Sequence, residues 1–280
     1  MAFRMWRHRH LRRRFAKVSS QAVSAASYGV PLHWPRMTNW GDSFGPLVTE
    51  FLSEKPVFFT EISKRHYVVI GSFLGHTNNE NSNVWGAGII RKAAIPNPRT
   101  VYYAVRGPYT RKNILKGGGE CPEIYGDAGI SVKDVYPMHQ VPKRRRLGVV
   151  LHWRDFGLIQ TVQDPAVKVI NTATHDLYGF CHEINKCEII ATSSLHALIA
   201  AHAYGIPAVW IKISNNPIGD DVKFFDYLHS NGCEAAPAMM TQITSADLAK
   251  AARAAFIAIH HPENFIRACP FISDKKKTLC

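Results

Sequence analysis

The sequence lacks the long apolar stretch that a membrane-spanning helix needs. No run within its 280 residues approaches the roughly 20 apolar residues that cross a bilayer, and no apolar segment follows the basic N-terminus as in a secretory signal. Its six cysteines are scattered, with no CxxC pair and no zinc-type spacing to histidine. We therefore predict free thiols in a reducing compartment, a cytoplasmic protein and no metal site.

Acidic residues are also scarce, because 21 Asp and Glu stand against 34 Lys and Arg, for a formal net charge of +13. Seven of the basic residues lie in residues 1–17, which contain no acid. A basic tail suits an anionic membrane surface or nucleic acid, and residues 1–27 also fit a mitochondrial targeting sequence. We expect peripheral contact with the inner face of a membrane. The remaining positive charge favours anionic ligands.

The sequence does contain an alternation of strand-like and helix-like segments on both sides of a basic linker, QVPKRRR at residues 140–146. Hydrophobic residues make up 46% of the chain, enough for a packed core. The alternation predicts an α/β fold with two Rossmann-like domains that face each other across a cleft. We expect a basic, irregular N-terminal extension, an N-terminal α/β domain, a C-terminal α/β domain, and a C-terminal helix and tail, over residues 1–36, 37–140, 147–240 and 241–280.

The most informative stretch reads IIATSSLHALIAAHAYGIP, from residue 189 to 207. An apolar strand is followed by Ser193 and Ser194, two candidate N-caps, and then by a helix that Gly205 ends. In a βαβ unit such a helix N-terminus lies at the carboxyl edge of the sheet, where its dipole favours an anion. His196 stands in the first turn, where a bound anion would favour a cationic imidazole; the alternative is a histidine that packs against a neighbouring loop. His196 is our first candidate for catalysis.

Two further strand-to-helix junctions carry polar residues. Arg106 follows the strand-like segment 100–105, and Arg111 lies five residues on, so the two are expected to flank one helix start and to bind carboxylate or phosphate. Near the N-terminus, Asn39 precedes a helix-like segment for which Asp42 or the next serine is the expected cap. A lone GxG at residues 86–88 lacks the rest of a dinucleotide fingerprint, which excludes that type of site.

Seven segments together resemble the polysaccharide pyruvyl transferase family, in family order. They are NWGD (39–42), VWGAGI (84–89), RGPYTR (106–111), YGDAGI (125–130), LGVVLHWRD (147–155), SSLHALIAAHAYGIPAVW (193–210) and KFFDYLHSNG (223–232). Ala197 departs from the usual glycine after the histidine, and Ala128–Gly129 replaces the commoner Pro-Ala. The resemblance implies a fold like the GT-B glycosyltransferases. It also implies transfer of the pyruvyl group of phosphoenolpyruvate onto two sugar hydroxyls as a cyclic ketal, with release of phosphate.

On this reading His196 and Arg106 are the expected catalytic residues. The expected substrate-binding residues are Arg111, Ser193, Ser194, Leu195, Asn39, Asp42, His152 and Lys223. Phosphoenolpyruvate is the donor substrate, and the chemistry requires no metal and no other cofactor. The acceptor is a sugar of a polysaccharide or of its precursor, and a lipid-linked precursor would suit a basic tail at a membrane.

Two alternatives remain open. A GT-B-type glycosyltransferase that uses a nucleotide sugar would need the same cleft and the same helix N-terminus for its diphosphate. A basic nucleic-acid-binding protein would need aromatic residues interleaved with Lys and Arg on one face. The basic residues instead cluster in the tail and the linker, so we expect no nucleic-acid partner.

Overall fold

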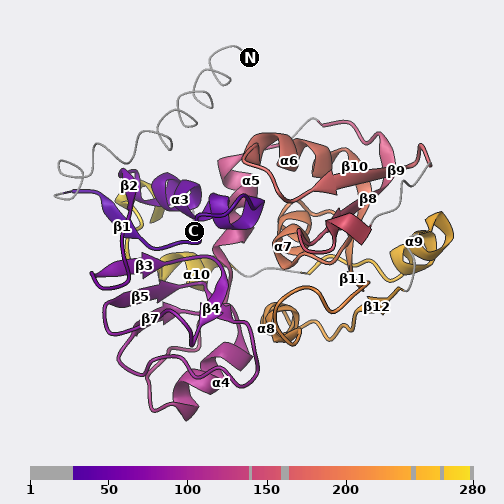
Figure 1. Cartoon of the computed structure of the whole chain (residues 1–280). Coiled ribbons are helices and arrows are strands. Elements are labelled where there is room, and N and C mark those ends of the chain that lie inside the picture. Colours follow the sequence, from indigo (N-terminus) through magenta and orange to yellow (C-terminus); the bar gives the residue numbers. More distant parts are fainter. Residues whose placement is uncertain (1–27, 139–140, 159–163, 241–243, 259–261, 278–280) are drawn as a thin grey trace.

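The computed structural model describes residues 28–138, 141–158, 164–240, 244–258 and 262–277. Within these residues two five-stranded parallel sheets form two halves of the molecule, joined in the middle by helices (Figure 1). This confirms the predicted α/β class with Rossmann-like parallel sheets. The basic tail, and with it the predicted membrane contact and targeting sequence, lies outside the described residues.

The first sheet has the strand order β2-β1-β3-β5-β7. Its strands in that order are Val57–Phe59, Val30–Leu32, His66–Val68, Ser82–Trp85 and Val101–Ala104. A separate parallel pair joins β4 (Ser72–Leu74) to β6 (Gly88–Ile89). The strand β1 lies in the stretch expected to be irregular, and that expectation is wrong there. Val30 and Leu32 are buried on one face of this short strand, a period-two pattern that its proline concealed.

The second sheet has the strand order β12-β11-β10-β8-β9. Its strands in that order are Ala238–Met239, Ala208–Lys212, Cys187–Thr192, Arg145–Leu151 and Val167–Asn171. The strand β8 begins at Arg145, within the basic linker. The predicted strand–helix–strand unit is present as β10, a helix and β11, with Ile190 opposite Ala208 in the ladder.

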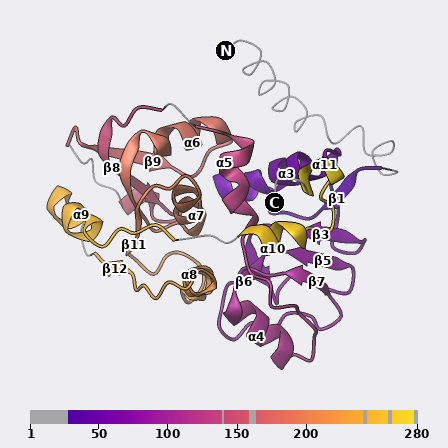
Figure 2. The same ribbon diagram turned by 180° about the vertical axis from the view of Figure 1, so that it is seen from behind.

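The helices connect the strands. Those of at least eight residues are α3 (Trp40–Ser53), α4 (Pro108–Lys116), α6 (Leu177–Asn185), α7 (Leu195–Ala203), α8 (Val222–Ser230) and α9 (Ser245–Ala252). The shorter ones are α5 (Val132–Val135), α10 (Pro262–Arg267), α11 (Asp274–Lys277) and the 3₁₀ turns Ala128–Ser131 and Phe156–Leu158. In the two views, α3, α5 and α7 lie toward the middle of the molecule, whereas α4 and α9 lie at its periphery (Figure 1 and Figure 2). None of the helices in the described residues is long and apolar enough to cross a membrane.

The C-terminal segment returns to the first half of the molecule. The C-terminal helix expected within residues 241–280 is present as α9 and ends at Ala252, because the chain then turns to pair Phe256 with Ala208 as an antiparallel bridge. The return is made by α10, which lies on the first half in Figure 2. The Trp85 indole donates a hydrogen bond to the Phe265 carbonyl at 2.8 Å, and the two rings stack at 4.3 Å. Residues 275–277 lie in α11.

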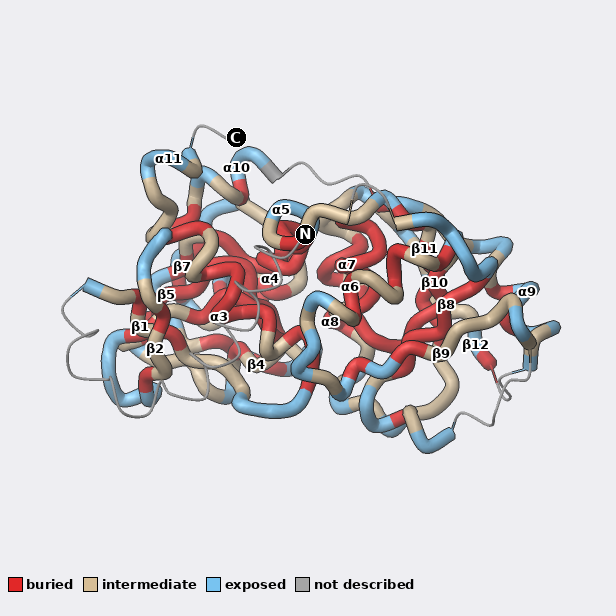
Figure 3. The backbone as a smooth tube through the Cα atoms, turned by 90° about the horizontal axis from the view of Figure 1, so that it is seen from above, coloured by how far each residue is buried: buried red, intermediate tan, exposed pale blue. Residues whose placement is uncertain are grey.

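The two halves share one apolar core. Trp40 of α3 stacks on Phe180 of α6 with ring centroids 4.7 Å apart, and the same buried cluster continues through Leu195 and Leu198 of α7. In Figure 3 the buried parts of α3 and α7 lie toward the middle of the molecule, between the sheets. Burial of this continuous apolar surface stabilises the contact between the halves.

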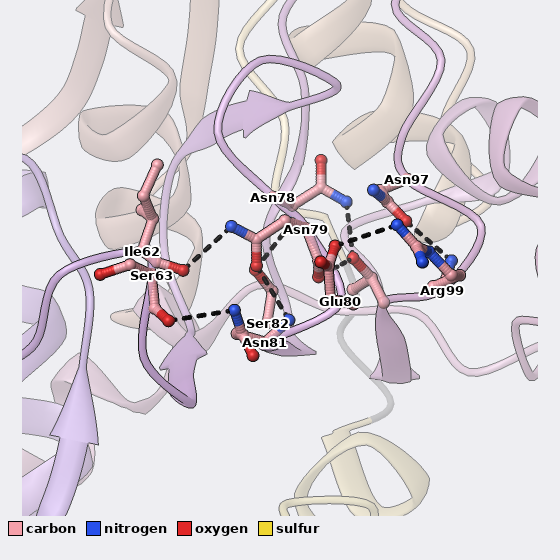
Figure 4. A network of polar contacts seen from close by, with 10 residues as sticks. Ile62, Ser63, Asn78, Asn79, Glu80, Asn81, Ser82, Asn97 and Arg99 are labelled. Carbon is pink, nitrogen blue, oxygen red and sulfur yellow. Dashed lines mark hydrogen bonds and ion pairs between the residues drawn. The ribbon is translucent and has the colours of Figure 1, made fainter.

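A polar network connects loops at the amino ends of the strands of the first sheet (Figure 4). The side-chain amide of Asn79 donates to the Ile62 carbonyl at 2.9 Å, and that of Asn81 donates to the Ser63 carbonyl at 3.2 Å. These residues precede β5, so they lie at the amino ends of the strands. The network therefore supports the loops that face away from the carboxyl ends, where ligands bind in parallel sheets.

Candidate functional site

Two helix N-termini, one from each half of the molecule, meet at His196. The imidazole lies in the first turn of α7, directly over Gly41 in the first turn of α3. A Cβ atom added at Gly41 would overlap the His196 ring, so the close approach requires glycine. Because each N-terminus carries partial positive charge and backbone N–H donors, their meeting point favours an anion.

The capping of the two helices differs from the expectation. Asn39, and not Asp42 or the serine after it, caps α3, and its Oδ1 accepts a hydrogen bond from the Gly41 N–H at 3.1 Å. Ser194 occupies the N-cap position of α7 but makes no side-chain cap hydrogen bond. Ser193 caps nothing. The first turn of α7 therefore has no side-chain cap, and its N–H groups suit an anionic ligand.

Lys223, in the first turn of α8, brings a cation close to this point. The residue is only 8% exposed, and burial with the charge of Arg106 lowers the pKa of its ammonium group to about 8. The carboxylates of Asp221 and Asp42 act in the opposite direction. Lys223 is therefore mostly protonated at pH 7, a desolvated cation that an anion would stabilise.

The two histidines near Lys223 are neutral at pH 7. Burial and the charges of Lys223 and Arg106 lower the pKa of His196 to about 3. Burial and Lys223 likewise lower the pKa of His152 to about 4, and its Nδ1 accepts a hydrogen bond from the Arg154 N–H at 3.2 Å. Such shifts indicate a site with excess positive charge. A dianion bound there would raise both pKa values.

Two carboxyl groups complete the site, and the sequence interpretation assigned a role to only one of them. Burial raises the pKa of Asp42 to about 6 against the effect of Lys223. Burial also raises the pKa of Asp127 to about 6, although a 2.9 Å hydrogen bond from the Gly129 N–H opposes the shift. Asp127 and His196 line the same narrow gap between the halves. Asp127 lies in the segment YGDAGI, two residues after an isolated bridge from Tyr125 to Val105, and it caps the 3₁₀ turn at Ala128–Ser131.

Arg106 is fully buried, and its guanidinium group is already engaged within the protein. It donates to Ser72 Oγ at 2.5 Å and to the Ile89 carbonyl at 2.7 Å, and lies 3.3 Å from the Asp226 carboxylate on α8. Its buried Nε–H has no hydrogen-bond partner among the described residues. These contacts differ from the expected guanidinium open to a ligand. Arg106 acts on the site as a buried positive charge that lowers the pKa of His196.

The structure does not bring Arg111 to Arg106. Its Nε donates to the Cys121 carbonyl at 3.1 Å, and one terminal nitrogen lies 4.0 Å from the Glu123 carboxylate. The expected pair of arginines around one helix start is therefore wrong in its geometry. The reason is that Arg111 is the fourth residue of α4 and extends along the helix toward the loop at residues 121–123.

Ser193 belongs to a polar cluster with Asp155 and His152, which lies next to the site around His196. Its Oγ donates to Asp155 Oδ2 at 3.1 Å and accepts from the His152 N–H at 2.9 Å, so it fixes the loop after β8. Leu195 is 4% exposed and packs in the core, which leaves only its backbone for a ligand. Among the described residues no group of three or more His, Cys, Asp or Glu side chains is placed to hold a metal ion.

Two known proteins are similar to this chain over most of its length. The chain is 27% identical over 207 residues to an uncharacterized protein of Acanthamoeba polyphaga mimivirus, a match that covers 70% of this chain and 72% of that protein. The crystal structure of a functionally uncharacterized protein from Klebsiella pneumoniae is similar at a TM-score of 0.40 and 10% identity, and covers 81% of this chain and 98% of that one.

The sequence profile of one family matches residues 30–215, which contain Gly41, Arg106, Asp127 and His196. That family is described as polysaccharide pyruvyl transferase, which supports a role in pyruvyl transfer to a polysaccharide or its sugars. The match extends over most of the chain, from β1 to the loop after β11, and the chain therefore belongs to the polysaccharide pyruvyl transferase family.

Proposed function

We propose that the protein transfers the pyruvyl group of phosphoenolpyruvate onto two hydroxyls of one sugar, forming a cyclic ketal and releasing phosphate. In this proposal residues 37–140 and 147–240 are two domains arranged as in the GT-B glycosyltransferases, and the donor site lies where α3 meets α7. The observation that carries the proposal is the convergence of two helix N-termini and Lys223 on a neutral His196.

The charges at this point match the donor. Phosphoenolpyruvate carries a carboxylate and a phosphate, and its binding needs cations together with N–H donors. Lys223 supplies a buried ammonium group, and the uncapped first turn of α7 supplies backbone N–H groups. Arg106 adds a fixed positive charge. Asn39 and Asp42, at the start of α3, are proposed partners of sugar hydroxyls.

The reaction needs one proton donor and one proton acceptor. A proton is added to the methylene carbon of the enol, and the first sugar hydroxyl attacks the adjacent carbon. The second hydroxyl then displaces phosphate at the same carbon. Of the two hydroxyl protons, one balances the proton added to the methylene and the other leaves with phosphate.

We base the proposed assignment of these roles on the pKa values of the site. A carboxyl group with a pKa of about 6, as in Asp42 or Asp127, is partly protonated near neutral pH and suits the proton donor. His196 is neutral, with a pKa of about 3, and it becomes the proposed acceptor of a hydroxyl proton once the bound dianion raises that pKa. His152 is proposed to contact phosphate or acceptor. The cycle uses no cofactor besides the donor, and no nucleic acid is proposed as a partner.

The proposal is tested by two measurements on the full chain. Calorimetry follows phosphoenolpyruvate binding, and release of inorganic phosphate is followed with phosphoenolpyruvate and a set of sugar acceptors. We expect His196→Ala to remain folded and to lose phosphate release, whereas the control His76→Ala, at an exposed position, keeps it. Wild-type turnover in His196→Ala would remove His196 from the mechanism. Release of a nucleotide from a nucleotide sugar, without phosphoenolpyruvate binding, would favour a glycosyltransferase.

A further inference from the structure

A second hollow, separate from the gap beside His196, opens at the carboxyl edge of the second sheet. It encloses about 50 Å³ and lies between the end of β11, the loop that follows it and the start of α8. Its polar lining consists of Asp155, Ser193, Lys212, Ser214, Asn215 and Asp221. We propose that this hollow is the acceptor subsite and that it takes an uncharged sugar ring. The inference rests on the proposed function and deepens it.

The polar groups of the hollow suit hydroxyls. Asp155 is 1% exposed, and its carboxylate accepts hydrogen bonds from Ser193 Oγ at 3.1 Å and from Ser214 Oγ at 2.5 Å. Each carboxylate oxygen and each serine oxygen keeps a free lone pair for a further donor. The result is a fixed row of acceptors, which is the chemistry that recognises the O–H groups of a sugar.

An apolar surface lies beside these acceptors. Trp210 of β11 and Phe224 of α8 line the same hollow, and their rings stack 4.3 Å apart at an interplanar angle of 5°. A pyranose presents C–H groups on its faces and hydroxyls at its edge. The hollow therefore offers contacts for both parts of the ring.

The charge of the hollow argues against a phosphate or a nucleotide. Asp155 and Asp221 bring two carboxylates, and the single cation of the lining, Lys212, is paired with Asp221 at 2.5 Å. An anion placed here would meet the Asp155 carboxylate without a free cation among the lining residues. At the gap beside His196, by contrast, the charges of Lys223 and Arg106 are close enough to lower the pKa of His196. In this proposal the anionic donor binds beside His196, and the neutral acceptor binds in the second hollow.

The hollow adjoins the donor site. Ser193 lines it and precedes His196 by three residues, and Phe224 lines it and follows Lys223 directly. The carboxylates of Asp155 and Asp221 lie close enough to Lys223 to raise its pKa, against the effect of burial. A ring seated here would present its edge toward Lys223. The enclosed space holds roughly four water molecules, so one edge of the ring enters and the rest of a glycan extends outward.

The test uses the full chain and three defined probes, methyl β-D-galactopyranoside, methyl β-D-glucopyranoside and the methyl glycoside of N-acetyl-β-D-mannosamine. Saturation-transfer NMR measures their binding, and calorimetry measures phosphoenolpyruvate binding to the same samples. Asn215→Trp places a large side chain at the exposed rim of the hollow. Asn216→Trp is the matched control, since this neighbour is exposed and does not line the hollow. Asp155→Asn removes the central carboxylate.

We expect at least one glycoside to bind the wild type and the Asn216→Trp protein. We expect its affinity to fall at least about tenfold in Asn215→Trp and in Asp155→Asn, with phosphoenolpyruvate affinity kept in Asn215→Trp. Unchanged glycoside binding in Asn215→Trp would overturn the inference even if Asp155→Asn failed to fold. So would a wild type that binds phosphoenolpyruvate and none of the glycosides. A wild type that binds a glycoside but does not bind phosphoenolpyruvate would instead refute the proposed donor.

Discussion

The ion pair between Arg106 and Asp226 gives the sharpest prediction about how the two halves are held. Both side chains are 0% exposed and lie 3.3 Å apart, and Asp226 also accepts hydrogen bonds from the Thr110 N–H at 3.0 Å and the Thr110 hydroxyl at 2.6 Å. Arg106 and Thr110 belong to the first half, whereas Asp226 lies on α8 in the second. Asp226→Asn therefore leaves a buried guanidinium group without its closest counter-charge.

The expected cost is large because the charge that remains is desolvated. Removal of one partner of a buried pair destabilises a protein by about 3–5 kcal/mol, whereas an exposed pair contributes about 0–1 kcal/mol. We expect the free energy of unfolding, measured by urea denaturation, to fall by that larger amount in Asp226→Asn. The control is Glu263→Gln, which removes an exposed partner of Arg267 and should change the free energy by about 0.5 kcal/mol or less.

A second variant separates the charge from the packing. The double substitution Arg106→Met and Asp226→Leu removes both charges and keeps apolar volume, so it should cost less than the sum of the two single substitutions. A loss below about 1 kcal/mol in Asp226→Asn, or strict additivity in the double variant, would refute the reasoning. Either result would mean that solvent or another carboxylate, such as Asp127, already balances Arg106.

Three further substitutions test the candidate site and the packing of the C-terminal segment on the first half of the molecule. Since Lys223 loses its proton as the pH rises through about 8, and only the protonated form attracts an anion, calorimetry should show phosphoenolpyruvate affinity falling above that pH, and Lys223→Met should bind weakly at every pH. Gly41→Ala should displace the His196 ring and abolish phosphate release in the enzyme assay, and it should also lower the melting temperature, because the added methyl group overpacks a buried contact between the halves. Phe265→Ala should lose the stack on Trp85 and lower the urea-unfolding free energy by about 3–5 kcal/mol.

The periodic elements were predictable from the sequence because local patterns determine them. The strand β10, the helix α7 and the strand β11 follow from an apolar run, helix-forming residues and a Gly-Pro stop. The start of α3 was missed by a few residues, because Asp42 and the next serine are as good capping residues as Asn39. Only the backbone path distinguishes among the three.

The site was predictable only in part because its contacts join residues far apart in the chain. His196 was found from its place in a helix, but its contact with Gly41 spans both halves, and no local pattern encodes it. Arg106 shows the same limit. Its position after a strand indicated a functional arginine, but its partner Asp226 lies 120 residues away in a helix that reads as ordinary and amphipathic.

The position of α8 affects both the contact between the two halves and the proposed donor site. Gly107 lies so close to the Asp226 backbone that an added Cβ would overlap the Asp226 carbonyl. The first half of the molecule therefore positions α8 by this contact, and it also supplies the counter-charge of Asp226. Lys223 lies one helical turn before Asp226, on the same face. The ion pair and the glycine thus set where the Lys223 ammonium group stands relative to His196. A substitution at Asp226 should therefore weaken phosphoenolpyruvate binding even in molecules that remain folded, although Asp226 itself contacts no ligand in the proposed site.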